Sequence, residues 1–527
     1  MLHENNSSLI GLVMTDENNT RIVKNTALLY FRMLLVMAVS LFTVRIVLDV
    51  LGTVDYGIYN VVGGIVIMFS FLSNTMASAA QRFFAFELGR NDLQKLKETF
   101  SLTIIIYSII AIIILLLAET IGLWFLNTQL VIPAERMESA NWVYQFSIFS
   151  FLVTIMTIPY NAVIIARENM KVYAWVSILE VILKLGIVYI LVYLSFDKLK
   201  LYAILMFLIT VIINMIYRIV CKNKYDECHF RFFWDKDLFY SLISYSGWNL
   251  FGAMAGVLNN QGINILLNIF FGPLVNASRA IAYRVNDAVN QFVLNFLTAV
   301  RPQITKLYAA GENTNMLKLV FQSSKFSCFL LLLLSMPVLL ETDFLLEIWL
   351  KETPQYVVLF TRLVIITALI DSLSYPLLTA ALATGKIKYY QLIVGGLLLL
   401  NLPTSYCFLK LGFPPQTTMY ISIVISAICL FARLLLLRGM VGLSIKEYLE
   451  KVLLSVLIVS FTSYLIPFFL ANQLDIGSLR FILVAITGII SCITAIYYLG
   501  ITTIERQFFI QLIRQKIFAR QSIKVRK

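Results

Sequence analysis

The stretch FGPLVNASRAIA (residues 271–282) has a counterpart 220 residues earlier in the chain, LGTVDYGIYNVV (51–62). Each stretch comes just before or within a long apolar segment. Each of these segments ends in a polar sequence, AAQRFFAFELGRNDLQKLKETF (79–100) in the first case and AVRPQITKLYAAGENTNMLKLVF (299–321) in the second. The two regions therefore read as copies of one unit.

Individual positions in these regions match at a nearly constant offset. The matches are Gly52 with Gly272, Arg82 with Arg301, and Gly89-Arg-Asn91 with Gly311-Glu-Asn313. A second pair, PYNAVIIARENMKVYA (159–174) and PLLTAALATGKIKYYQ (376–391), is offset by 217 residues. Matching glycines, loops and segment order together indicate an internal repeat rather than chance similarity among apolar helices.

Composition places this repeat in a bilayer. The 527 residues are 60% apolar and only 13% charged, whereas soluble domains carry roughly 25% charged residues. Segments of about 20 apolar residues are the unit of a membrane helix. We find fourteen of them, at residues 26–50, 57–80, 101–125, 142–166, 173–194, 201–220, 240–271, 274–299, 321–341, 356–384, 391–409, 417–438, 449–470 and 479–499.

The offset of the repeat covers six of these segments. The sequence therefore predicts an all-α integral membrane protein with about 14 transmembrane helices, built from two six-helix bundles in a parallel repeat plus two C-terminal helices. Such a repeat is a transporter design, with the substrate site between the two copies. The predicted regions are a cytoplasmic tail (1–21), the N-terminal bundle (22–237), the C-terminal bundle (238–440), helices 13 and 14 (441–500) and a basic tail (501–527).

Lys and Arg concentrate in the loops and tails on the N-terminal side of these segments. The opposite loops carry only Arg136, Lys198, Lys200, Lys351 and Lys410. Positive charge marks the cytoplasmic side, so both termini are expected in the cytoplasm. This bias, together with a basic C-terminal tail suited to anionic lipid headgroups, accounts for the net charge of +13 without a nucleic-acid partner.

Three stretches carry a family likeness: LGTVDYGIYNVVGGI (51–65), RFFAFELGRND (82–92) and ATGKIKYY (383–390). With the six-plus-six-plus-two layout, they resemble polysaccharide flippases of the Wzx type, within the multidrug/oligosaccharidyl-lipid/polysaccharide exporter (MOP) superfamily. The resemblance covers about residues 20–500. It implies movement of an undecaprenyl-pyrophosphate-linked oligosaccharide across the bacterial inner membrane for polysaccharide export, O-antigen among the possibilities. It also implies membrane lipids and polysaccharide polymerase machinery as partners of a monomeric protein.

Polar residues inside the predicted spans mark a candidate substrate cavity, because ionisable groups in a membrane normally face a cavity or a partner. Most of those in SRAIAYRVNDAVNQF (278–292) fall on one half of a helical wheel. Amides suit sugar hydroxyls, and arginine suits pyrophosphate. The predicted cavity residues are Arg45, Asn60, Asn74, Asn249, Asn260, Asn264, Arg279, Arg284, Asp287, Asn290 and Gln291.

Each assignment has a structural alternative. Arg284 and Asp287, three residues apart, could neutralise each other, and Arg279 could extend to the outer membrane surface. Asp371 has no basic residue one turn away, so it is a candidate for binding a coupling proton or sodium ion, together with Asp287 and Glu180. Glu180 could instead pair with Lys184, four residues on.

Three other functions are weighed against sugar export. A multidrug/cation antiporter of the same superfamily would favour carboxylates over arginines in its cavity, and a lipid II flippase would share a cationic cavity. A membrane-embedded polysaccharide polymerase or ligase would need catalytic groups on a large outer loop. We find no such loop, no nucleophile–base pair and no zinc-type spacing around Cys221, Cys228 and His229. The prediction is a transporter without enzymatic activity, cofactor or metal, driven by a proton or sodium gradient.

Overall fold

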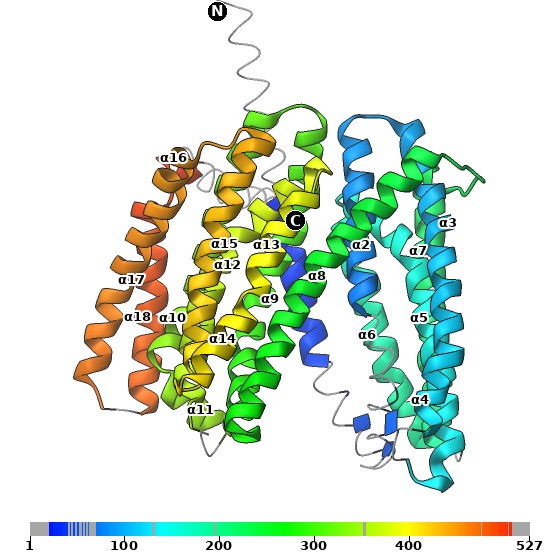
Figure 1. Ribbon diagram of the computed structural model, residues 1–527, viewed down its shortest axis with the longest axis horizontal. Helices are drawn as coiled ribbons and strands as arrows, with labels where there is room; N and C mark the ends of the chain where they lie inside the picture. The colour runs from blue at the N-terminus through cyan, green and yellow to red at the C-terminus, as the bar shows by residue number, and fades with distance from the viewer. Residues whose placement is uncertain are drawn as a thin grey trace, which may run out of the picture. The chain divides into compact units, whose positions relative to one another are not determined.

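The computed structural model describes residues 21–39, 70–128, 132–193, 196–350, 355–475, 477–503 and 505–507, with scattered positions between 43 and 62. Within these ranges the chain is almost entirely helical and contains no strand (Figure 1). The helices are Arg21–Val39, α2 (Ser70–Gly89), α3 (Leu93–Leu117), α4 (Leu123–Thr128), α5 (Met137–Ala166), α6 (Met170–Tyr193), α7 (Lys198–Lys224), α8 (Lys236–Phe271), α9 (Pro273–Ala309), α10 (Asn313–Leu340), α11 (Thr342–Leu350), α12 (Val357–Thr384), α13 (Lys388–Leu399), α14 (Asn401–Lys410), α15 (Thr417–Val441), α16 (Ile445–Tyr448), α17 (Leu454–Gln473) and α18 (Ser478–Ala495).

The helices confirm the all-α membrane fold. Eleven segments among the described residues are long and apolar enough to cross a membrane. Every predicted span from residue 101 onward coincides with one or two of the helices. The helices α2, α8 and α9 are not among the eleven, and α9 in particular is interrupted by polar side chains. The total of fourteen spans stays a prediction.

Two turns recur with the same backbone geometry. The turn after α2 has Asn91 at φ 56°, and the turn after α9 has Gly311 at φ 79°. In both turns the next helix begins two residues later. Positive φ favours Gly and Asn, so these positions are equivalent and the local offset is 220. The matching of Gly89 with Gly311 at offset 222 was therefore two residues out of register.

The turns after α5 and α12 form the second pair. Glu168 has φ 59° and Gly385 has φ 76°, which reproduces the predicted offset of 217. A glutamate in this conformation is uncommon, and its neighbours hold it in place. Its carbonyl accepts a hydrogen bond from Asn25 Nδ2 at 3.3 Å, and its carboxylate pairs with Lys306. The repeat thus reappears as backbone conformation.

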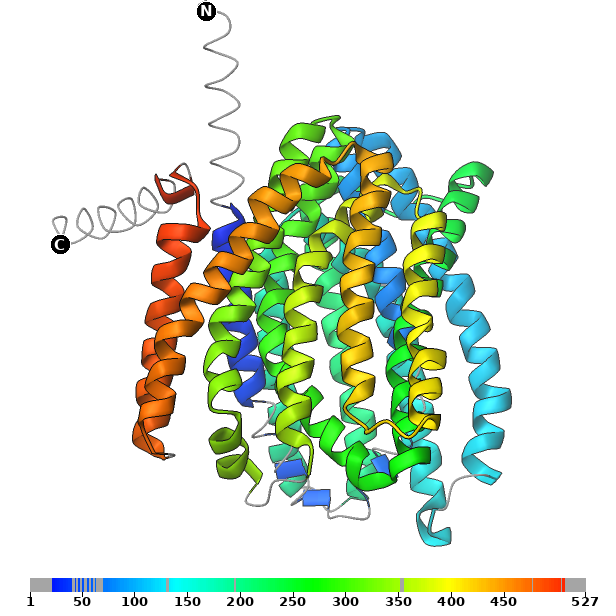
Figure 2. The ribbon, with the colours of Figure 1, turned by 60° about the vertical axis from the view of Figure 1, so that its left-hand side comes forward.

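The chain forms two compact units. One contains Asn25–Ala253 with Thr305–Gly311, and within it α5 packs against α7, α2 and α3 (Figure 1). The other contains Met254–Ile304 and Glu312–Lys527. There α12 packs against α15 and α10, and α17 packs against α18 (Figure 2). The predicted bundle boundary at residues 237 and 238 stays a prediction.

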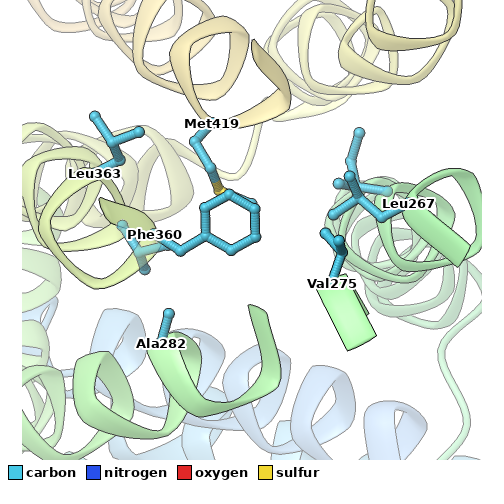
Figure 3. Packing of buried hydrophobic residues seen from close by; sticks show 8 residues of the cluster. Leu267, Val275, Ala282, Phe360, Leu363 and Met419 are labelled. Atoms are coloured by element: carbon cyan, nitrogen blue, oxygen red, sulfur yellow. The ribbon is translucent and has the colours of Figure 1, made fainter. Parts of the chain in front are cut away.

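A hydrophobic cluster in the second unit fixes α8 and α9 against α12 and α15. Its fully buried members are Ile263, Leu267, Val275, Ala282, Phe360, Leu363, Val364 and Met419. Figure 3 shows the Met419 side chain against the ring of Phe360, with side chains of α8 and α9 approaching from the other sides. This packing holds the end of α8 and the start of α9 in place, and the polar residues described next project from these two helices.

Candidate functional site

Five polar residues meet across the hairpin of α8 and α9; Asn260, Gln261, Asn264, Arg279 and Tyr283 are called the Arg279 cluster below. The hairpin turns at a glycine with φ 79°, at position 272. Residues 264 and 279 lie eight residues before and seven after it, so antiparallel helices bring them to the same level. Arg279 donates from Nη1 to Asn264 Oδ1 and from Nη2 to Asn260 Oδ1 at 2.7 Å. Its Cζ lies 4.2 Å from the ring centroid of Tyr283.

Arg279 is buried, with only 3% of its surface exposed. Its contacts are amide oxygens and an aromatic face, and among the described residues no carboxylate forms an ion pair with it. Nε is buried without a hydrogen-bond acceptor. A buried cation normally has an anionic partner, so the cluster carries an uncompensated positive charge. The structural alternative, in which Arg279 extends to the membrane surface, is disfavoured because Tyr283 and two amides surround its guanidinium.

The exposed face of α9 is polar along its length. Its exposed side chains, of those the structure describes, are Ala280, Arg284, Asp287, Ala288, Gln291 and Arg301. None of the large apolar side chains described in α9 is exposed. A helix that faces lipid exposes apolar side chains, whereas charged groups in a membrane face water or a partner. The accessible face of α9 therefore suits a water-filled path.

Arg284 and Asp287 were expected either to line a cavity or to neutralise each other. Both side chains are exposed. Among the ion pairs that the described residues form, none joins these two. The charge of Arg284 does act on the Asp287 carboxylate, but both side chains are exposed and can be reached by a ligand or by water. Gln291, one turn further along the same face, is exposed as well.

Asp371 lies in a second polar group, formed by α9, α12, α13 and α15. Its carboxylate accepts a hydrogen bond from Ser426 and lies near the guanidinium of Arg433. Arg433 Nε in turn donates to Tyr390 Oη at 3.1 Å. No basic residue lies one turn from Asp371 along α12, as the sequence indicated, but Arg433 of α15, more than 60 residues away in sequence, lies near its carboxylate. Sequence spacing along one helix could not reveal this partner.

Asn290 joins this second group, because its Nδ2 donates to Tyr375 Oη at 3.2 Å. Tyr375 lies one turn from Asp371 on α12. The side-chain oxygen of Asn290 is buried without a hydrogen-bond donor. Helix α9 thus contributes to both polar groups, near its start through Arg279 and near its middle through Asn290.

Glu180 forms the structural pair that its spacing allows. Lys184 Nζ lies 2.6 Å from Glu180 Oε1, and about a third of each side chain is exposed, 36% and 37%. A carboxylate already neutralised by a neighbouring lysine has less tendency to bind a coupling ion. The pair favours the structural interpretation of Glu180.

Four predicted cavity residues are not placed near the Arg279 cluster. Arg45 and Asn60 lie outside the described residues, as does the side chain of Asn74. Asn249 belongs to the other compact unit, where its Nδ2 donates to the Thr75 carbonyl at 3.5 Å. The structure therefore brings together only the predicted residues of α8 and α9 that follow residue 254.

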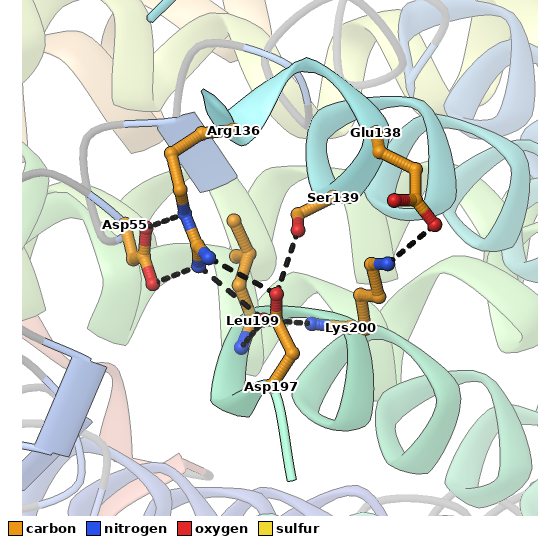
Figure 4. Close-up of polar contacts among 7 residues, drawn as sticks. All are labelled: Asp55, Arg136, Glu138, Ser139, Asp197, Leu199 and Lys200. Atoms are coloured by element: carbon orange, nitrogen blue, oxygen red, sulfur yellow. Dashed lines mark hydrogen bonds and ion pairs between the residues drawn. The ribbon is translucent and has the colours of Figure 1, made fainter. Parts of the chain in front are cut away.

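An ionic cluster that the sequence did not predict joins three segments of the first unit (Figure 4). Arg136 binds Asp55 through two hydrogen bonds and lies 3.0 Å from Asp197. Asp197 also accepts from Ser139 Oγ at 2.8 Å and caps the first turn of α7. Burial alone would raise the pKa of the Asp197 carboxyl, but the hydrogen bonds from Ser139, the Lys200 backbone and Arg136 bring it below its ordinary value.

This cluster gives a pH dependence. A carboxyl whose pKa is lowered by folding stabilises the folded state above its unfolded pKa of roughly 3.9, and this contribution is lost as the pH falls through the lowered value. We expect Asp197→Ala to lower the thermal stability of the purified protein at pH 7 by the equivalent of about 1–3 kcal/mol, through loss of the cap and of the carboxylate. The difference from wild type should shrink below pH 4. A difference that is the same at pH 7 and pH 3 would contradict this role.

Solved structures with the same fold are helical membrane transporters. The MATE transporter ClbM in complex with Rb+ has a TM-score of 0.68 and 14% identity, covering 81% of this chain and 96% of its own. The Vibrio cholerae MATE transporter VcmN in its bent form gives 0.65 and 17%, covering 83% and 99%. A MOP superfamily transporter from Pyrococcus furiosus gives 0.66 and 12%, covering 80% and 96%. At these identities the similarity establishes the fold.

A search of curated protein sequences finds no match. The family model described as "Polysaccharide biosynthesis protein" matches residues 22–308, more than half of the chain. Eleven helices long and apolar enough to cross a membrane, among the described residues, make it a multi-pass membrane protein. The chain belongs to the polysaccharide biosynthesis protein family, and its fold is that of the MATE and MOP superfamily transporters.

Proposed function

We propose that the protein flips a polyprenyl-pyrophosphate-linked oligosaccharide across the bacterial inner membrane for polysaccharide export. The observation that carries the proposal is the exposed polar face of α9, on which the guanidinium of Arg284 and the amide of Gln291 lie about two turns apart. Arginine bonds two oxygens of a phosphate while staying charged. The amide of Gln291 offers a donor and an acceptor to sugar hydroxyls. A pyrophosphate attached to a glycan requires both kinds of group.

Family membership and the Arg279 cluster support the same substrate class. The matching family is described by polysaccharide biosynthesis. The cluster adds a buried guanidinium that forms no ion pair with any carboxylate in the described part of the chain, which favours an anionic ligand over a cationic one. In this proposal the lipid tail remains in the bilayer, the polar head follows the polar face of α9, and alternating access exposes the head to each side in turn.

A test in cells separates sugar export from other roles. In a bacterial strain that lacks its own polysaccharide flippase, lipid-linked oligosaccharide should accumulate, and expression of the protein should lower that accumulation and restore surface polysaccharide. A variant with Arg284 replaced by alanine should restore neither. The proposal would be contradicted if, with several donor glycans, cells expressing the wild-type protein accumulated as much lipid-linked oligosaccharide as the same cells without it.

A multidrug or cation antiporter is the second candidate. It is favoured by the carboxylates Asp287 and Asp371 in the second unit, and by the fold shared with MATE transporters. This function predicts that expression raises resistance to cationic dyes such as ethidium. The flippase proposal predicts unchanged resistance.

An ion gradient is the proposed energy source, with Asp371 as the residue that takes up the proton or sodium ion. Unlike Glu180, which pairs with Lys184, Asp371 forms no ion pair among the described residues, and its place near Arg433 and Ser426 would let a bound ion or proton alter the contacts among α12, α13 and α15. We expect Asp371→Asn to reduce the stimulation of flipping by an imposed gradient about tenfold, the effect of roughly 1.4 kcal/mol of coupling. Glu180→Gln, which breaks an exposed pair on α6, is the control and should keep normal stimulation. Wild-type flipping that ignores proton and sodium gradients would refute the coupling.

A further inference from the structure

An apolar pocket of about 360 Å³ opens beside the Arg279 cluster. It lies where α8 passes α14, in the second compact unit. Its lining residues are Gly262, Ile265, Leu266, Leu402, Pro403 and Tyr406. The lining is almost free of polar atoms, so the pocket would accept a hydrocarbon and not a sugar or an ion.

The local sequence accounts for the pocket. Helix α13 ends at Leu399 and α14 begins at Asn401, and Pro403 lies in the first turn of α14, where proline is tolerated. Gly262 has no side chain, and a Cβ there would clash with the end of the Leu402 side chain. Leu266 and Leu402 pack against the hydrophobic cluster of Figure 3, which keeps the base of the pocket rigid.

A polar edge adjoins the apolar lining on the same two turns of α8. Gln261 precedes Gly262 and Asn264 precedes Ile265. Asn264 Nδ2 donates to Gln261 Oε1 at 3.2 Å, while Asn264 Oδ1 accepts from Arg279. A hydrogen-bonded chain therefore runs from the buried guanidinium to the exposed amide of Gln261, which borders the pocket.

Resting on the proposed function, we infer that this pocket binds the first isoprenoid units of the polyprenyl carrier, with the phosphate at the exposed amide of Gln261, the member of the Arg279 cluster that borders the pocket. In a polyprenyl phosphate the hydrocarbon chain begins one bond from the phosphate oxygen. In a phospholipid a glycerol ester separates the phosphate from the acyl chains. The apolar lining and the polar edge are adjacent residues of α8, which fits the first arrangement better than the second.

The test measures binding of three probes to the full-length protein in detergent by native mass spectrometry: undecaprenyl phosphate, undecaprenol and dioleoyl phosphatidic acid. Gly262→Leu fills the pocket and should weaken undecaprenyl phosphate binding about tenfold, by displacing several methylene-sized groups. Gly256→Leu is its control, because a side chain at that position on α8 meets open space. Wild type should bind undecaprenyl phosphate at least tenfold more tightly than either other probe.

A second pair of variants changes exposed side chains and so leaves the packing between α8 and α14 undisturbed. Ile265 and Ile269 are both exposed on α8, at 61% and 69%, but only Ile265 lines the pocket. Ile265→Ser should weaken binding about threefold and Ile269→Ser should not. Equal effects of pocket and control variants would overturn the inference, as would tight, pocket-dependent binding of phosphatidic acid, which would assign the pocket to bilayer lipid. If only the pocket inference is wrong, the wild-type protein should still flip the lipid-linked oligosaccharide. If the proposed function itself is wrong, the wild-type protein should neither flip this substrate nor bind undecaprenyl phosphate.

Discussion

Arg284→Ala is expected to reduce flipping of a lipid-linked oligosaccharide at least tenfold, with little change in thermal stability. Arg284 is exposed on the polar face of α9 and takes part in no ion pair among the described residues, so its removal leaves no buried group without a partner. A charge-assisted hydrogen bond to a phosphate contributes about 1.5–3 kcal/mol, which corresponds to a ten- to hundredfold change. Initial flipping rates in proteoliposomes measure the effect.

Two further variants give this prediction its controls. Arg284→Lys keeps the charge but loses the planar fork, so it should retain part of the activity. Arg362→Ala removes another exposed arginine of the same unit, one that pairs with Asp343 at 2.8 Å. A surface pair of this kind contributes about 0–1 kcal/mol, so flipping should be unchanged. Full activity of Arg284→Ala at normal expression would remove Arg284 from the substrate path.

Arg279→Met should reduce flipping at least tenfold while the protein stays folded. Methionine fills a similar volume in an apolar setting, and the variant removes a buried charge for which the described residues provide no carboxylate partner. Replacing buried charged groups by apolar residues is often neutral or stabilising. The amide oxygens of Asn260 and Asn264 lose a hydrogen-bond donor, which limits any gain in stability. Flipping rate and melting temperature, measured on the same preparation, separate the two effects.

Arg480→Met is the matched control for Arg279→Met. Arg480 Nε lies 2.8 Å from Glu341 Oε1, and the Glu341 side chain is only 2% exposed. Removing this partner leaves a buried carboxylate and should destabilise the protein by about 3–5 kcal/mol, while the remaining folded protein flips substrate normally. If Arg279→Met instead behaved like Arg480→Met, losing stability but not specific activity, the Arg279 cluster would be structural.

Helix positions could be predicted from the sequence because a helix that crosses a bilayer needs about 20 apolar residues. The predicted spans beginning at 101 and later all coincide with helices. The repeat was also detectable, since turns that need positive φ leave marks such as Gly311 and Gly385. The register between the two copies of the repeat was predicted less well. Asn91 adopts the positive φ that Gly311 adopts in the other copy, while Gly89 ends the preceding helix.

Some contacts of the candidate site could be predicted from the sequence and others could not, for a physical reason. Contacts across a tight helix hairpin follow from counting outward from its turn, and Asn264 with Arg279 could be paired in this way. Contacts between distant helices leave no such trace, so Arg433 beside Asp371 and Arg136 between Asp55 and Asp197 were missed. The burial of Arg279 was missed for a related reason, because a helical wheel gives a direction but not the depth of packing behind it.

The central claim is that the protein moves an anionic lipid-linked glycan, and flipping in reconstituted vesicles tests it most directly. Undecaprenyl-pyrophosphate-linked oligosaccharide would be placed in vesicles with the purified protein, and the fraction reached by an added glycosidase followed over time. We predict that wild-type protein makes the entire pool accessible, while Arg284→Ala and Arg279→Met vesicles stay near the half exposed in protein-free vesicles. Accessibility in wild-type vesicles equal to that in protein-free vesicles, with an imposed proton or sodium gradient of either direction, would contradict the account.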